Sequence, residues 1–303
     1  MTKMYIFGKN YKKNDVNEII NSLVYIGYRY GFSKLNNSLY VSDIGWGCTL
    51  RNGQMLLANV FLKHLLPNWK YKNHIPKKYY NIISNFRDNQ SNIFSIHNLV
   101  DKYSLFDKKA GDWIGPYTVA NLISEFKTTI LNLYNIQYVC ETSGIFDVTD
   151  YNILDNTYLI TIPVRLGVEF ITPEYYSNIR FLTKCESFMG IIGGNNNKSF
   201  YFIGSSGNKL IYLDPHTSTS YDSLENDISL YRAKTEQYLD IKDLSPTFTI
   251  CFYINSETKL NEISNINNNI PNKKYPIFEI GNKTNIKQLE CEIDDDTDWN
   301  III

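Results

Sequence analysis

The chain has 303 residues, of which 43% are hydrophobic, and 30 Lys and Arg residues nearly balance 31 Asp and Glu residues. This length is enough for one large domain with a buried core, and a net charge of −1 gives no field that would attract nucleic acid. No run reaches the roughly 18 apolar residues that span a bilayer, and Met1–Gly8 lacks the apolar core of a signal peptide. We therefore expect a cytoplasmic protein without a nucleic-acid partner.

Apolar periodicity predicts helices in the first half of the chain and short strands in the second half. Helices are expected over 14–27, 48–66 and 117–134, and a short helix that begins at Pro173 is expected over 172–182. Strands are expected over 137–141, 158–163, 188–193, 199–204, 209–214 and 247–254. From residue 256 onward the sequence is polar and rich in asparagine, which indicates a folded region over 1–255 and a flexible tail over 256–303.

Cys48 is a candidate nucleophile at the start of the second predicted helix. It follows Gly45–Gly47, and the long apolar run after it favours a helix. The unpaired N–H groups at a helix N-terminus stabilise a thiolate, and the glycines allow a substrate to approach the sulfur. A thiolate is the form of cysteine that attacks carbonyl groups.

Asp214 and His216 supply a carboxylate and a base at the end of a predicted strand. Residues two apart in a strand point to the same face, so Asp214 would orient the imidazole of His216 while Pro215 points away. Together with Cys48, this pair indicates a cysteine hydrolase.

Three other histidines compete with His216 for the role of base. His64 lies sixteen positions along the predicted Cys48 helix, roughly 24 Å away at about 1.5 Å per residue, which excludes it. His74 and His97 stay possible, although neither has an acidic residue at a same-face spacing. Five cysteines without a C-x-x-C and four histidines without an H-x-x-x-H offer no metal site at usual spacing, so we expect neither a metal nor another cofactor.

The segment Ser42–Met55 resembles the nucleophile segment of the autophagins, the autophagy-related protein four cysteine proteases. Further segments resemble blocks of that family in the same order, and together they cover roughly residues 5 to 255: Tyr5–Lys9, Ser95–His97, Ile114–Ala120, Pro163–Gly167, Gly190–Gly194, Tyr201–Gly204 and Leu213–Thr217.

The resemblance implies a papain-like α+β cysteine protease fold with a small auxiliary subdomain, and a catalytic order of Cys, Asp, His. It makes Cys48 the nucleophile, His216 the base and Asp214 the residue that holds the imidazole. Tyr28 corresponds to a family tyrosine whose hydroxyl joins the Cys48 backbone N–H in the oxyanion hole.

Trp113 resembles the tryptophan that covers the family's active site and narrows its entrance to glycine. The family's partner loop for this tryptophan reads Asn195–Ser199 here, and Asn196 stands near the place of the usual proline. Because Pro fixes φ and Asn does not, we expect a more flexible loop and a looser gate.

The family cleaves a ubiquitin-like autophagy modifier after a glycine near its C-terminus, and it also releases that glycine from phosphatidylethanolamine. The expected partners are thus the modifier precursor, the lipidated modifier and, through it, a membrane surface. At the chain end, Trp299 and Ile302 follow Asp294–Asp298 and resemble the short motif that binds such modifiers by adding a strand to their sheet.

Two alternatives remain at this stage. The ubiquitin-fold modifier one proteases also resemble the segments Gly45–Cys48 and Asp214–His216, although Arg51–Met55, Trp113 and the tail fit the autophagins better. A catalytically inactive scaffold that binds the modifier is opposed by the intact Cys48, Asp214 and His216.

Overall fold

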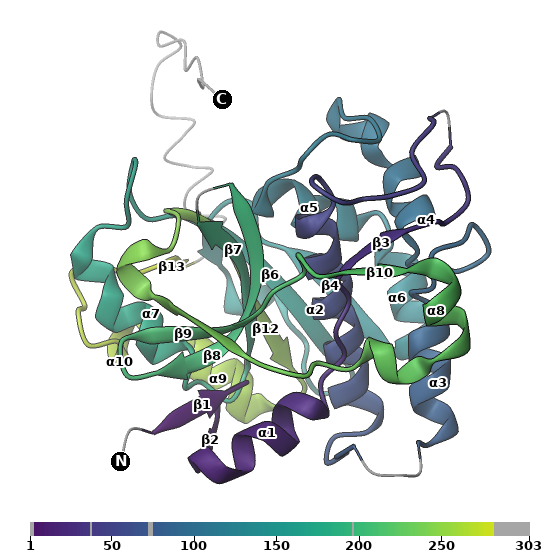
Figure 1. Ribbon diagram of the computed structural model, residues 1–303. Helices are drawn as coiled ribbons and strands as arrows, with labels where there is room; N and C mark the ends of the chain where they lie inside the picture. The colour runs from purple at the N-terminus through teal and green to yellow at the C-terminus, as the bar shows by residue number, and fades with distance from the viewer. Residues whose placement is uncertain (1–2, 37, 72–74, 196, 282–303) are drawn as a thin grey trace, which may run out of the picture.

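A central mixed sheet organises the molecule, and helices pack on both of its faces (Figure 1). The computed structural model describes residues 3–36, 38–71, 75–195 and 197–281. The strands of the main sheet are β1 Met4–Ile6, β2 Lys9–Tyr11, β4 Ile136–Cys140, β6 Thr157–Arg165, β7 Phe188–Asn195, β8 Lys198–Ser206, β9 Lys209–Leu213, β11 Gln237–Asp240 and β12 Thr247–Ile254.

These strands run in the order β11-β9-β8-β7-β12-β6-β4, and β1 joins β8 and carries β2 beside it. Neighbours are antiparallel except for β4 and β6, which are parallel. Two short parallel pairs lie outside this sheet: β3 Tyr28–Tyr30 with β10 Ser218–Ser220, and β5 Ile145–Phe146 with β13 Glu279–Ile280. This mixture of strands and separate helices confirms the α+β class.

The helices divide between the two faces of the sheet. Their bounds are α1 Lys13–Asn21, α2 Cys48–Leu65, α3 Lys77–Ser84, α4 Ile96–Asp101, α5 Pro116–Ser124, α6 Lys127–Tyr134, α7 Tyr176–Leu182, α8 Tyr221–Asn226, α9 Glu257–Ser264 and α10 Ile266–Asn269. The larger core cluster holds apolar side chains of α1 to α6, and the smaller cluster holds those of α7, α9 and α10. Among the described residues, no helix combines the length and apolar character needed to cross a bilayer.

Strand β12 shows how the sheet separates these two clusters. Phe248, Ile250, Phe252 and Ile254 belong to the smaller cluster, whereas Cys251 and Tyr253 belong to the larger one. Successive side chains of a strand point to opposite faces, and both faces are covered here, so an almost continuous apolar sequence is required.

Helix α2 is the central helix of the larger cluster and contacts β7 and β8. All side chains from Cys48 to Leu62 are buried. A helix that is buried all round needs partners for its polar side chains. Asn59 has them: its Oδ1 accepts from the Val24 N–H at 3.0 Å, and its Nδ2 donates to the Val24 and Met55 carbonyls.

The expected helix over 48–66 and all six expected strands are confirmed to within three residues at each end. Two helix predictions were too long. The helix expected over 14–27 ends at Asn21. The Val24 N–H and carbonyl hydrogen-bond the Asn59 side chain of α2 and are therefore not available to continue the helix. The helix expected over 117–134 breaks into α5 and α6 at Glu125 and Phe126, whose N–H groups bond carbonyls only three residues back.

Residues 257–281 differ from the flexible tail expected after residue 255. Their buried residues Leu260, Ile263, Ile266 and Ile270 join the smaller core cluster, and β13 pairs with β5. The asparagine-rich composition obscured this apolar spacing, in which exposed asparagines fill the positions between the buried residues. The rest of the expected tail, 282–303, lies outside the described residues.

We expect Ile263→Ala to lower the free energy of unfolding by about 2–4 kcal/mol, because it leaves a cavity at a fully buried position. Asn261→Ala, an exposed position on the same helix, is the matched control. Urea unfolding followed by circular dichroism measures both changes. If the two variants unfold at the same urea concentration as the parent protein, α9 is not part of the cooperative domain.

Candidate active site

Cys48 is the first residue of α2, and the turn before it is built by Asp43. The Asp43 carbonyl accepts from the Trp46 and Gly47 N–H groups at 3.2 and 2.9 Å. A Cβ on Gly47 would come 2.4 Å from the Asp43 carboxylate, so only glycine fits there. Gly45 has φ of +90°, a conformation that side chains disfavour. The glycines thus bring the chain close to Asp43 and place Cys48 at the helix start.

Asp214 and His216 lie in a turn directly after β9, and the structure brings them together. The imidazole Nδ1 is 2.5 Å from Asp214 Oδ1, and the His216 N–H donates to the same oxygen at 3.0 Å. The expected pairing is therefore present, but an Asp-centred turn produces it and not the common face of a strand. With Nδ1 engaged by Asp214, the His216 imidazole also lies close enough to Cys48 for the two groups to shift each other's pKa.

Tyr28 and Trp113 also lie near the sulfur. Both side chains lower the pKa of Cys48, as does the main chain of Ser199. The Tyr28 ring stands edge-on to His216 at 5.3 Å between centroids, and its backbone N–H donates to the Pro215 carbonyl at 2.8 Å. Trp113 is 46% exposed and forms part of the surface above the sulfur. The structure therefore gathers five of the residues identified from sequence, Cys48, Asp214, His216, Tyr28 and Trp113.

The pKa values of the site follow from these contacts. Burial disfavours the thiolate, but hydrogen bonds from His216, Ser199, Trp113 and Tyr28 outweigh it and lower the pKa of Cys48 below its ordinary value. Burial also disfavours the imidazolium, yet Asp214 and Cys48 raise the pKa of His216 to about 9. The two shifts favour a thiolate–imidazolium pair at neutral pH.

The pKa values of Asp214 and Tyr28 are also shifted. Burial disfavours the ionised form of Asp214, but hydrogen bonds with His216 lower its pKa overall, so the carboxylate remains charged. Burial and the neighbouring Cys48 raise the pKa of Tyr28 well above its ordinary value. The phenol therefore remains protonated and can donate a hydrogen bond.

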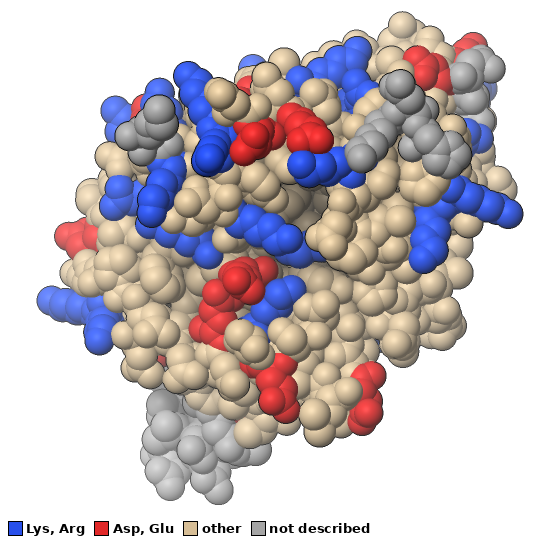
Figure 2. Space-filling model, turned by 90° about the horizontal axis from the view of Figure 1, so that it is seen from below, with Lys and Arg blue, Asp and Glu red and all other residues tan. Residues whose placement is uncertain are grey.

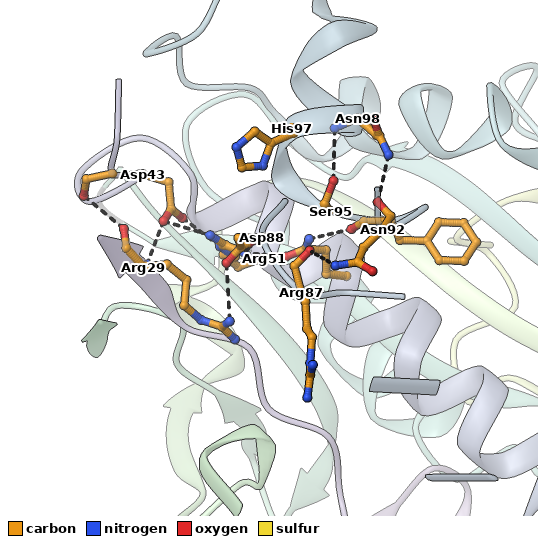
Figure 3. Close-up of polar contacts among 12 residues, drawn as sticks. Arg29, Asp43, Arg51, Arg87, Asp88, Asn92, Ser95, His97 and Asn98 are labelled. Carbon is orange, nitrogen blue, oxygen red and sulfur yellow. Dashed lines mark hydrogen bonds and ion pairs between the residues drawn. The ribbon is translucent and has the colours of Figure 1, made fainter. Parts of the chain in front are cut away.

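A buried ion cluster beneath the site was not predicted from sequence (Figure 3). Arg51 lies between Asp43, at 2.8 Å from Nε, and Asp88, at 2.8 Å from Nη1. Arg29 Nη1 is 3.3 Å from Asp88, and the Arg29 N–H donates to Asp43 at 2.7 Å. The cluster thus connects β3, which carries Tyr28, to the turn before Cys48 and to α2. One signal was available, an arginine within the apolar α2 sequence, because a buried arginine requires carboxylate partners.

The segment expected to form the gate, Asn195–Ser199, joins two strands of the main sheet. Asn195 ends β7 and Lys198 begins β8, and the two residues are paired in antiparallel register. The Asn52 side chain of α2 donates to Ser199 Oγ at 2.8 Å and fixes this hairpin near the sulfur. Asn196 itself lies outside the described residues, as do Trp299 and Ile302.

The rival histidines that the structure describes are engaged elsewhere. His97 is buried and its Nε2 lies 2.9 Å from both oxygens of Ser33. His64 pairs with the Tyr253 hydroxyl at 2.7 Å, and His74 lies outside the described residues. Within the described part of the chain, no three His, Cys, Asp or Glu side chains are placed to hold a metal ion.

Residues 13–266 match the family model of the peptidase C54 catalytic domain. The chain belongs to the peptidase C54 family. It is 30% identical to the cysteine protease ATG4A of Xenopus laevis over 85% of this chain and 76% of that protein. It is 28% identical to ATG4D of Xenopus laevis, over 86% and 70% of the two chains, and to human ATG4A, over 92% and 82%.

This membership confirms the resemblance seen in the sequence. The C54 chain is a cysteine peptidase with the papain-like α+β fold.

Cys48 should be alkylated faster than Cys140, Cys185 and Cys251, because the pKa values of those three thiols are raised by burial and that of Cys48 is lowered. Its rate should form a plateau between its lowered pKa and pH about 9, where His216 loses its proton. Iodoacetamide labelling from pH 5 to 10 with peptide mass spectrometry measures each thiol. Faster labelling of Cys140 or Cys185 in the native protein would contradict this assignment.

Proposed function

We propose that this C54 peptidase cleaves a ubiquitin-like autophagy modifier after a glycine near its C-terminus, with Cys48, His216 and Asp214 as catalytic residues. The observation that carries the proposal is the arrangement at the sulfur. His216 and the half-exposed Trp113 both lie near the Cys48 sulfur and lower its pKa. A flat indole beside the nucleophile leaves a narrow entrance that suits a residue without a side chain.

In the proposed reaction the Cys48 thiolate attacks the glycine carbonyl carbon and forms a tetrahedral oxyanion. The Tyr28 hydroxyl and the Cys48 backbone N–H donate hydrogen bonds to that oxygen. The His216 imidazolium then gives its proton to the leaving amine as the carbon–nitrogen bond breaks, which leaves a thioester on sulfur. Water, deprotonated by neutral His216, attacks the thioester carbon; the carbon–sulfur bond breaks, the modifier leaves with a C-terminal glycine carboxylate, and the thiolate–imidazolium pair is restored.

The same chemistry serves two substrates. In the precursor the leaving amine belongs to a peptide, and in the lipidated modifier it belongs to phosphatidylethanolamine. Both bonds are amides of the same glycine, so one nucleophile and one oxyanion hole suffice. The second reaction brings the enzyme transiently to a membrane surface through its substrate, and we place the enzyme in the cytoplasm.

The test incubates the protein with precursors of ubiquitin-like modifiers and determines product masses. We expect release of the peptide after the glycine from the autophagy modifier, and background turnover for Cys48→Ala with its fold retained, because alanine has no nucleophile. Cys140→Ala, a half-buried cysteine away from the site, is the matched control. Processing of only the ubiquitin-fold modifier one precursor would favour the alternative protease, and no turnover would favour an inactive binding scaffold.

We also propose that Trp299 and Ile302 bind the modifier from the end of the chain. Deleting residues 294–303 should raise KM for lipidated modifier on vesicles and leave kcat nearly unchanged, because a tethered contact increases local concentration without touching the transition state. Trp299→Ala with Ile302→Ala should reproduce the deletion, whereas Asn300→Ala should not. A deletion that lowers kcat and leaves KM unchanged would contradict this division.

A further inference from the structure

A cavity of about 100 Å³ lies at the end of α2 opposite Cys48. The β1–β2 hairpin, α1, the last turns of α2 and β7 form its walls. Most of the wall is apolar, including Phe7, Ile19, Leu23, Leu66, Trp69 and Met189. Figure 2 shows the face of the molecule on which β1, β2 and α1 lie; it is hollowed near its centre, and both basic and acidic side chains lie around the hollow.

The Lys63 amine lies in this wall, and its Nζ is buried without a hydrogen-bond partner among the described residues. Its nearest aromatic neighbours are the rings of Phe7 and Tyr253, whose centroids lie 6.0 and 5.8 Å from Nζ. Contacts this long stabilise a cation only weakly. A buried amine without a partner is costly, so the site gains stability from any group that supplies one.

The charged groups around Lys63 do not act as hydrogen-bond partners of its amine. Burial, followed by the neighbouring Lys259 and Lys9, lowers the pKa of Lys63 to about 7 against the opposing effect of Glu186 and Glu262. The Glu262 carboxylate is occupied by three donors, the N–H groups of residues 186 and 187 and the hydroxyl of residue 187. The nearest acidic groups therefore influence Lys63 without binding it.

Among the other polar wall groups, Asn59 and Ser22 already have hydrogen-bond partners, and the Tyr11 hydroxyl also lines the cavity. The side-chain amide of Asn59 is hydrogen-bonded to the backbone of Val24 and Met55. Ser22 donates its hydroxyl to the Glu18 carbonyl at 2.7 Å and accepts from the Tyr71 N–H at 2.9 Å. A polar group entering the cavity would thus find its partner in Lys63, and Lys9 in the wall adds a second positive charge. These features select an anion attached to an apolar body.

We propose that this cavity binds a small apolar monocarboxylate, with its carboxylate on Lys63 and its hydrocarbon body against Phe7, Leu23 and Trp69. The carboxylate supplies the missing partner through a charge-assisted hydrogen bond, and the body covers the apolar wall. The cavity of about 100 Å³ is smaller than the engineered apolar cavity of about 150 Å³ that holds benzene, so it encloses only part of a six-carbon acid. Lys63 lies fifteen residues after Cys48, or about 22 Å along α2, so the site is separate from the peptidase centre.

Calorimetry with hexanoate tests the proposal, and hexan-1-ol and hexylamine serve as probes of the same length. Hexanoate should bind the wild-type protein more tightly than either of them. Lys63→Met keeps the length of the side chain and removes the amine, and it should raise the Kd for hexanoate about tenfold or more while leaving that for hexan-1-ol unchanged. Ile19→Trp fills the cavity and should weaken the binding of all three probes.

Lys259→Met is the matched control, because Lys259 stacks on Tyr253 outside the cavity wall. The Lys259→Met variant should bind hexanoate at least as tightly as the wild-type protein, since removing a repelling charge favours the Lys63 ammonium. Binding should take up a proton near pH 7.5, and the Kd should rise up to about tenfold per pH unit above pH 7, because the carboxylate binds only the protonated amine. Buffers with different ionisation enthalpies measure this uptake.

Three results would overturn the proposal. The first is an absence of hexanoate binding to the wild-type protein. The second is a Kd for Lys63→Met that stays within about twofold of wild type, which would mean that the amine is not the carboxylate partner. The third is hexan-1-ol binding as tightly as hexanoate, which would mean that only the apolar wall is used.

Discussion

The buried pairing of Arg51 with Asp43 and Asp88 is the interaction on which the geometry of the site depends. Arg51 belongs to α2, Asp43 to the turn before Cys48, and Asp88 to the loop after α3. Removing one partner of such a buried group leaves an uncompensated charge, which typically costs about 3–5 kcal/mol. Because Asp43 also binds the Arg29 N–H next to Tyr28, one cluster connects the segments that carry Cys48 and Tyr28. The buried cluster thus holds the glycine-rich turn before Cys48 in place, although glycines alone would leave that turn flexible.

The electrostatics of the site balance burial against hydrogen bonding. Burial alone would keep Cys48 as a thiol and His216 as a neutral imidazole, which is a poor arrangement for nucleophilic attack. Each becomes charged because the other is present and because Asp214 holds the imidazole. The other buried thiols lack such donors, and their pKa values move in the opposite direction. Reactivity is therefore a property of the constellation and not of cysteine burial.

Helix α2 links the two sites at its ends. At its start, backbone N–H groups and four hydrogen-bonding neighbours surround the sulfur, and Asn52 fixes the Ser199 hairpin above it. Near its end, Lys63 faces an apolar cavity, and its amine has no hydrogen-bond partner in the part of the chain that the structure describes. The helix is buried for most of its length, so each polar side chain on it either has a dedicated partner or leaves an unsatisfied group. Arg51 and Asn59 are of the first kind, and Lys63 is of the second.

Sequence alone determined the α2 helix, the six strands and the candidates Cys48, Asp214 and His216, because their signals are local: apolar periodicity, glycines before a cysteine, and an aspartate two residues from a histidine. Tyr28 and Trp113 were identified only through the family resemblance. Sequence alone did not find the Arg51 cluster or the contact of Ser199 with Cys48, whose partners are up to 151 residues apart along the chain. It also predicted a flexible tail from residue 256, because composition does not reveal that every third or fourth residue from Leu260 to Ile270 meets a second core. Tertiary structure decided these points, since a buried polar group or an isolated apolar stripe acquires its meaning only from what packs against it.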